Sequence, residues 1–89
     1  MKKAVTLQIT GRVQNVGFRY NTRRKAEEFQ ISGFVKNQPD GSVYVEAAGE
    51  EENLDRFMLW CQKGPTWARV DDVKIQKIPH QEYEGFSVK

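Results

Sequence analysis

The chain has few of the residues that several kinds of protein chemistry require. Its 89 residues include one cysteine and one histidine. One cysteine cannot form a disulfide within the chain, and so low a cysteine content is typical of a reducing cytoplasm. The histidine, His80, has no neighbours in the sequence that would complete a catalytic triad or a metal site. We therefore expect neither a disulfide framework nor histidine-based chemistry.

Long apolar segments and an excess of charge are also missing. No apolar run approaches the roughly 20 residues that span a bilayer. The basic start, Met1-Lys2-Lys3, is followed by alternation rather than an apolar block, so we expect no signal peptide. The net charge of +2 arises from mixed signs and is too small to indicate a nucleic-acid partner. These features predict a cytoplasmic monomer with one domain over residues 1–89 and no membrane contact.

Hydrophobic periodicity and turn signals divide the chain into alternating segments. Period-two alternation predicts strands, and apolar residues three or four apart predict helices. We expect the last long strand to bury Val73 and Ile75. The expected strands cover residues 5–10, 34–38, 42–47, 70–78 and 86–88, and the expected helices cover residues 18–29 and 50–63.

The predicted order is βαββαβ followed by a short extra strand. That order is typical of an α+β sandwich in which two helices cover one face of an antiparallel sheet. The predicted fold class is therefore ferredoxin-like.

The segment Gly11–Arg19 joins the first strand to the first helix and carries the clearest chemical signal. The free N–H groups and positive dipole end of a helix attract an oxyanion. Consecutive loop amides add a concave backbone site, and the Arg19 guanidinium adds donors matched to phosphate or carboxylate. A strand-to-helix turn also needs glycine for steric reasons alone. The segment by itself is therefore consistent either with an anion site or with an ordinary structural turn. It lacks the Gly-Lys-Ser/Thr ending of a nucleotide P-loop and does not match G-x-G-x-x-G, which makes ATP hydrolysis an unsuitable assignment.

Topology brings a second polar residue to this segment. In the predicted fold, the first two strands run toward the same end of the sheet. The Gly11–Arg19 segment and the Pro39-Asp40-Gly41 turn then share that end. Alternation places Asn37 on the same face as Val35, which we expect the helices to cover. The Asn37 amide is thus predicted to point toward the anion site.

At these positions the sequence resembles the acylphosphatase family. The pattern G-x-V-Q-G-V-x-F-R is met at all but one of its fixed positions. A second block, G-x-V-x-N followed by D-G-S-V, and a weaker third block, K-G-P then A-x-V, are also present. The matching residues are Gly11, Val13, Gln14, Val16, Phe18, Arg19, Gly33, Val35, Asn37, Asp40, Gly41, Ser42, Val43, Lys63, Gly64, Pro65, Ala68 and Val70.

The resemblance implies hydrolysis of acyl phosphates to carboxylate and inorganic phosphate, without a metal or other cofactor. It implies that Arg19 holds the phosphate and that Asn37 orients the attacking water. Positioning and charge stabilisation are sufficient in principle, because an acyl phosphate is already activated. The backbone amides implied to bind the phosphate are those of Val13, Gln14, Asn15, Val16 and Gly17.

The chain departs from the family pattern at Asn15, where the family has a glycine. Asparagine tolerates a left-handed backbone better than most residues, so we expect Asn15 at positive φ and an active enzyme. The alternative is an inactive acylphosphatase-like domain that only binds a small anion.

Other residues and another class of function compete with this interpretation. Burial of Cys61 and packing of Trp60 and Trp67 are expected, and Asp71 and Asp72 should point to opposite faces of a strand. Arg23 and Arg24 either extend the positive field or form a solvated helix face. An RNA-binding sheet would need aromatic residues on its open face, where the sequence offers Thr6, Gln8, Thr10 and Tyr44.

Overall fold

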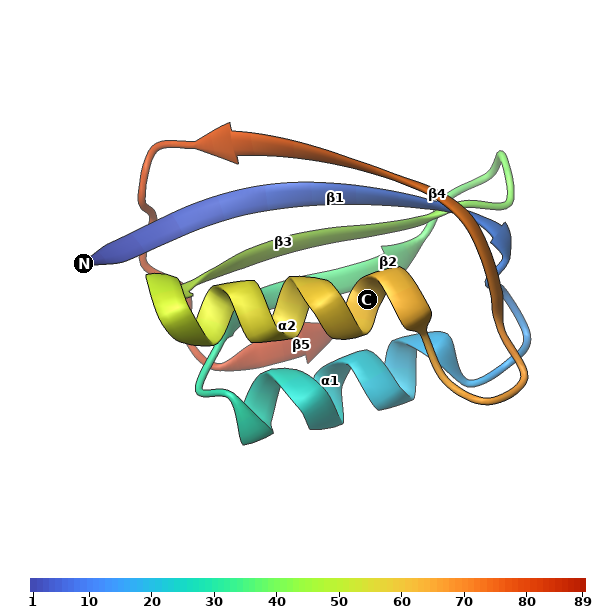
Figure 1. The fold of residues 1–89 in the computed structure, drawn as a ribbon, viewed down its shortest axis with the longest axis horizontal. Coiled ribbons are helices and arrows are strands. Elements are labelled where there is room, and N and C mark those ends of the chain that lie inside the picture. The colour runs from blue at the N-terminus through green and yellow to red at the C-terminus, as the bar shows by residue number, and fades with distance from the viewer.

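The computed structural model describes residues 1–89 as a five-stranded sheet with two helices on one face (Figure 1). The strand order is β4-β1-β3-β2-β5. The first four strands pair antiparallel, and β5 pairs in parallel with β2, so the sheet is mixed. The predicted ferredoxin-like α+β fold is confirmed. The elements are β1 (Lys2–Arg12), α1 (Phe18–Glu28), β2 (Ser32–Asn37), β3 (Val43–Glu50), α2 (Glu51–Lys63), β4 (Arg69–Ile78) and β5 (Phe86–Val88).

The core lies between the sheet and the helices. Most of the two predicted helical stripes is fully buried: Phe18, Thr22 and Ala26 on α1, and Leu54, Phe57 and Cys61 on α2. The other two predicted members, Phe29 and Met58, are only partly buried. Opposite them, alternate residues of β1 turn Val5, Leu7 and Ile9 inward. Complete burial of a large apolar side chain contributes about 1.5–3 kcal/mol, so these stripes fix the helices on the sheet.

Two expectations about packing are wrong. Ile75 is 41% exposed, although it pairs with the buried Leu7 and therefore lies on the helix-covered face. Its strand, β4, is an edge strand of the sheet, and there only Val70 and Val73, both partly buried, pack against the core. Trp67 lies in the loop after α2 and is 79% exposed, whereas Trp60 packs against the Phe18 ring.

The open face of the sheet carries an aromatic cluster that fastens the segment before β5. The rings of Phe34, Tyr44 and Tyr83 pack together with centroids 6.0 and 6.4 Å apart. The Tyr83 hydroxyl donates to Glu46 Oε1 at 2.6 Å, and the Tyr44 hydroxyl donates to Glu46 Oε2 at 2.7 Å. Desolvation, followed by the hydrogen bond to Glu46, raises the pKa of Tyr83 to about 12. The sequence alone revealed only Tyr44 of this cluster.

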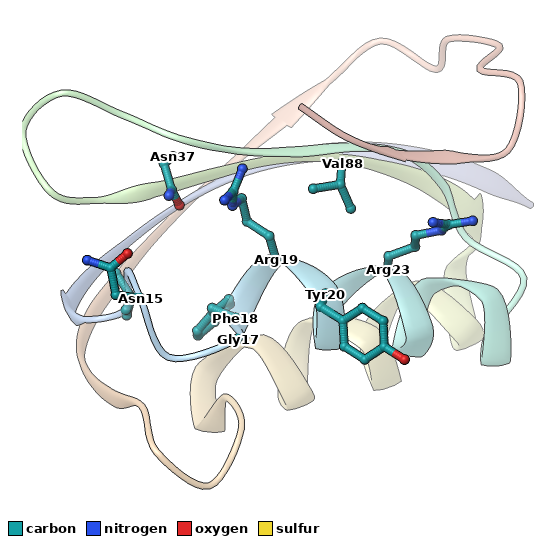
Figure 2. Close-up of a pocket in the computed structure, with 9 residues that line it drawn as sticks. Asn15, Gly17, Phe18, Arg19, Tyr20, Arg23, Asn37 and Val88 are labelled. Atoms are coloured by element: carbon teal, nitrogen blue, oxygen red, sulfur yellow. The ribbon is translucent and has the colours of Figure 1, made fainter.

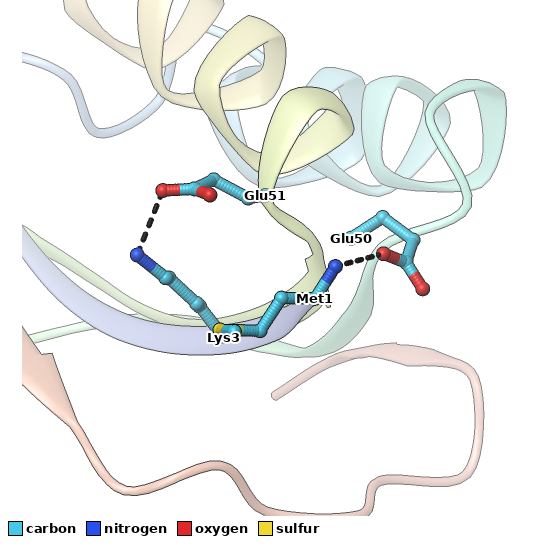
Figure 3. A network of polar contacts seen from close by, with 4 residues as sticks. All are labelled: Met1, Lys3, Glu50 and Glu51. Atoms are coloured by element: carbon cyan, nitrogen blue, oxygen red, sulfur yellow. Dashed lines mark hydrogen bonds and ion pairs between the residues drawn. The ribbon is translucent and has the colours of Figure 1, made fainter.

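Two exposed ion pairs join the start of β1 to the junction of β3 and α2, at the end of β1 away from the Gly11–Arg19 segment (Figure 3). The Met1 amine lies 2.9 Å from Glu50, and Lys3 lies 2.7 Å from Glu51. Hydrogen bonding to these cations lowers the pKa of both glutamates. Because these pairs are exposed, they contribute little to stability. Neither helix of the chain is long and apolar enough to cross a membrane.

Candidate functional site

A cavity of about 350 Å³ opens at the end of the sheet where β1 and β2 both finish (Figure 2). Its walls are the loop between β1 and α1, the first turns of α1, the end of β2 and one residue of β5. The lining residues are Val13, Asn15, Gly17, Phe18, Arg19, Tyr20, Arg23, Asn37 and Val88.

The loop over residues 13–17 presents unpaired backbone donors. These residues lie between β1 and α1, and none of their N–H groups donates a hydrogen bond within the chain. Gly17, the N-cap of α1, is left-handed with φ 76° and ψ 18°, and it makes no side-chain cap. The positive end of the helix dipole faces the same region. The loop and helix start therefore present N–H donors of the kind that suit an oxyanion.

Asn15 adopts φ 62°, which confirms the prediction of a positive φ at this position. That value is close to the left-handed α conformation, in which asparagine is among the most tolerated residues. The loop thus keeps a turn at the position where the family pattern has glycine.

Two amide side chains hold the loop in place, and sequence reasoning had assigned neither this role. Gln14 Nε2 donates to the backbone oxygens of Gln38 and Ser42 at 2.8 and 2.9 Å, which attaches the loop to the β2–β3 hairpin. Asn21 Nδ2 donates to the Gly17 oxygen at 2.8 Å, in addition to the backbone bond of the first helical turn. Asparagine four residues after a turn glycine is a weak signal, so the sequence did not reveal this bond.

Arg19 and Asn37 lie on the same cavity, 18 positions apart in the chain, as the topology predicts. Figure 2 shows the Asn37 amide at the end of β2 beside the Arg19 guanidinium. Arg19 Nη1 donates to the backbone oxygen of Lys89, just past β5, at 2.9 Å. This bond orients the guanidinium and leaves its other N–H donors for a ligand.

The predicted phosphate-binding residues are only partly at the cavity wall. Val13, Asn15, Gly17 and Arg19 line it, whereas Gln14 and Val16 do not. The prediction for those two residues concerns their backbone N–H groups and stays a prediction. Of the two further arginines weighed from the sequence, Arg23 lines the cavity, and Arg24 stacks on Tyr20 at 5.9 Å instead.

The residues discounted from the sequence lie outside this cavity. Cys61 is fully buried, and burial raises the pKa of its thiol far above the usual value. His80 contacts Glu82, and Asp71 pairs with Arg69. No group of three or more His, Cys, Asp or Glu residues lies close enough together to hold a metal ion.

The fold and the cavity define a class: a small ferredoxin-like domain whose cavity combines unpaired loop N–H groups with arginine and asparagine side chains. The acylphosphatase family model matches residues 5–88. The acylphosphatase of Archaeoglobus fulgidus is 48% identical over 85 residues, covering 96% of each chain. The chain belongs to the acylphosphatase family and is an enzyme that hydrolyses acyl phosphates.

Solved structures agree in three dimensions. An acylphosphatase from Coxiella burnetii matches with a TM-score of 0.95 at 35% identity, covering 99% of this chain and 93% of that one. The acylphosphatase of Bacillus subtilis matches with a TM-score of 0.94 at 32% identity, covering 100% and 99%.

Proposed function

We propose that the chain cleaves acyl phosphates without a metal, with the phosphate held by the 13–17 loop and Arg19 and the water oriented by Asn37. The observation that carries this proposal is the set of unpaired loop N–H groups on the same cavity as Arg19. Backbone donors and a guanidinium together match the three oxygens of a terminal phosphate.

The chemistry requires little beyond this arrangement. Water attacks phosphorus, the bond from phosphorus to the acyl oxygen breaks, and the products are a carboxylate, inorganic phosphate and a proton. The carboxylate is a weak base and leaves without a general acid. The cavity lining contains no carboxylate, thiol or imidazole, so binding, orientation and charge stabilisation are its means of catalysis.

The alternative, an inactive anion-binding domain, rests on Asn15 in place of the family's glycine. The left-handed backbone of Asn15 preserves the turn at a cost on the order of 1 kcal/mol, which is too small to abolish catalysis. This magnitude favours an active enzyme.

The deciding assay is ultraviolet-monitored hydrolysis of benzoyl phosphate in the presence of a chelator. Arg19→Ala should nearly abolish turnover and weaken inhibition by inorganic phosphate. Arg19→Lys should rescue little, because a point charge cannot replace a planar fork of donors. Asn37→Ala should lower kcat far more than phosphate affinity measured by calorimetry. Arg56→Ala, on exposed α2, is the control for charge loss.

Each part of the proposal has its own contrary outcome. Near-normal turnover in folded Arg19→Ala would overturn the phosphate assignment. Equal loss of phosphate affinity in Asn37→Ala and Arg19→Ala would show that the two roles are wrongly divided. Phosphate binding without turnover in the wild type would establish the inactive alternative, and activity lost on chelation would refute metal independence.

We also propose that the chain works in the cytoplasm as a monomer and binds no nucleic acid. On the open face, the Lys89 ammonium already lies over the Phe34 ring at 4.1 Å, which leaves that ring poorly placed to stack on a base. Size-exclusion chromatography and a single-stranded RNA titration test these two points.

A further inference from the structure

The cavity continues past Arg19 to a second guanidinium. Arg23 lies one helical turn after Arg19, and residues four apart share a helix face. Both line the cavity, together with Tyr20 and Val88. Figure 2 shows Val88 between the two arginines, and Asn37 on the opposite side of Arg19 from Arg23.

The direction of the reaction gives this extension a role. In a phosphoryl transfer the attacking and leaving oxygens are roughly in line across phosphorus. If Asn37 holds the water at the β2 side, the acyl group leaves on the side away from Asn37. Arg23 and Val88 lie there (Figure 2), so they are placed to contact the acyl group rather than the phosphate.

Arg23 is free to bind a ligand. Its only ion pair joins Nε to Glu27 at 3.3 Å, with side chains 53% and 58% exposed. Exposed helix pairs of this kind are weak, and both terminal nitrogens of Arg23 have no partner in the chain.

We propose that Arg23 is a specificity-determining residue that binds a second anionic group on the acyl part of the substrate. The substrate class is an acyl phosphate with a carboxylate or similar anion at the far end of the acyl group. Val88 contacts the apolar part between the two charges. This inference rests on the proposed placement of the phosphate at Arg19.

The test compares two rigid substrates that differ by one charge: benzoyl phosphate and 4-carboxybenzoyl phosphate. The wild type should have the higher kcat/KM for the carboxylated substrate, once each rate is divided by its uncatalysed rate. Arg23→Gln should lower that kcat/KM by about tenfold, the effect of one charge-assisted hydrogen bond, mostly through KM. The kcat/KM of Arg23→Gln for benzoyl phosphate should change by less than about twofold, because the substitution alters only the screened electrostatic potential at the phosphate. The matched control is Arg56→Gln, which removes the same charge from an exposed arginine of α2 that also pairs with a glutamate one helical turn away.

Three results would overturn the inference. They are no preference in the wild type, an equal loss for both substrates in Arg23→Gln, and an equal selective loss in Arg56→Gln. Failure of the underlying function is separate, because it would appear as benzoyl phosphate turnover that survives Arg19→Ala. Arg23 is solvent-exposed, and circular dichroism of each variant verifies that it folds.

Discussion

Replacing Gln14 by alanine is expected to loosen the attachment of the phosphate loop to the β2–β3 hairpin. The side chain donates two hydrogen bonds, at 2.8 and 2.9 Å, to the Gln38 and Ser42 oxygens. The Gln38 oxygen also accepts the backbone N–H of Gly41, and the Ser42 oxygen also accepts the backbone N–H of Gln38. The substitution therefore removes two bonds without leaving a carbonyl unpaired.

The magnitude follows from this accounting. A neutral hydrogen bond contributes about 0.5–1.5 kcal/mol net, and the larger penalty of an orphaned acceptor does not apply here. Gln14→Ala should therefore lower the free energy of unfolding by about 1–2 kcal/mol. For a domain of this size, about 1 kcal/mol corresponds to a fall of roughly 4–8 °C in Tm.

The effect on catalysis should exceed the effect on phosphate affinity. The loop carries the proposed phosphate donors and the hairpin follows Asn37, so this bond pair fixes their relative position. Small misplacements in a site that works by orientation are costly, and we expect kcat for benzoyl phosphate to fall by about tenfold or more. Gln14→Glu should be worse at pH 7, because a carboxylate cannot donate and would face two carbonyl oxygens.

The assays are urea unfolding followed by tryptophan fluorescence, and steady-state kinetics on the same preparations. Gln62→Ala, at an exposed position of α2, is the control and should leave both unchanged. If Gln14→Ala has the same free energy of unfolding as the wild type, the two hydrogen bonds contribute nothing to stability. A loss of stability with unchanged kcat would refute the argument that the attachment sets the catalytic geometry.

Three further substitutions test the loop, the end of α2 and the open face. Asn15→Gly should keep turnover or raise it by at most about tenfold, because it relieves a left-handed backbone strain on the order of 1 kcal/mol. Large losses of turnover and phosphate affinity would show instead that the Asn15 side chain itself binds phosphate. Gly64→Ala should lower the free energy of unfolding by about 1–3 kcal/mol. The backbone angles of Gly64, φ 74° and ψ −179°, belong almost only to glycine, and an added Cβ would lie 2.8 Å from the Phe18 ring. Unchanged urea unfolding would contradict this prediction. The hydrogen bond from Tyr83 lowers the pKa of Glu46, although desolvation opposes this shift. The stability that this bond contributes is therefore fully present above the ordinary pKa of 4.5, and it is lost as the pH falls through the lowered pKa of the folded state. Tyr83→Phe should thus lower stability by about 1 kcal/mol at pH 7 and by less at pH 3, and a pH-independent difference would refute the charged bond.

Periodicity predicted the elements because it reports directly which side of each element is apolar. The spacing of Phe18, Thr22 and Ala26 allows one helical face, and the alternation of Leu7 and Ile9 allows one strand face. All five of these residues are buried.

Periodicity does not report what covers a face. Ile75 lies on the correct face of β4, but the strand is at the sheet's edge and the side chain remains 41% exposed. Trp67 is in a loop, where no periodicity constrains it. Both errors concern contacts between elements that are distant in the chain, which a local pattern cannot encode.

At the site, topology alone brought Arg19 and Asn37 together, because it fixes which strand ends share an edge. The supporting bonds of Gln14 and Asn21 were not predictable in the same way. An amide side chain has several donors and acceptors and many possible backbone partners. Only the folded arrangement of loop, hairpin and helix selects among them.

The supporting bonds also explain how the loop accommodates Asn15. Three attachments fix different parts of the anion site: Gln14 holds the loop to the hairpin, Asn21 holds Gly17 to α1, and Arg19 is held by the Lys89 oxygen. Backbone strain persists only where the surroundings over-determine the conformation. The hydrogen bonds of Gln14 and Gly17, on either side of Asn15 in the chain, together contribute more free energy than the left-handed backbone costs, which is on the order of 1 kcal/mol. The glycine of the family pattern is therefore replaceable here, provided that the attachments on either side remain.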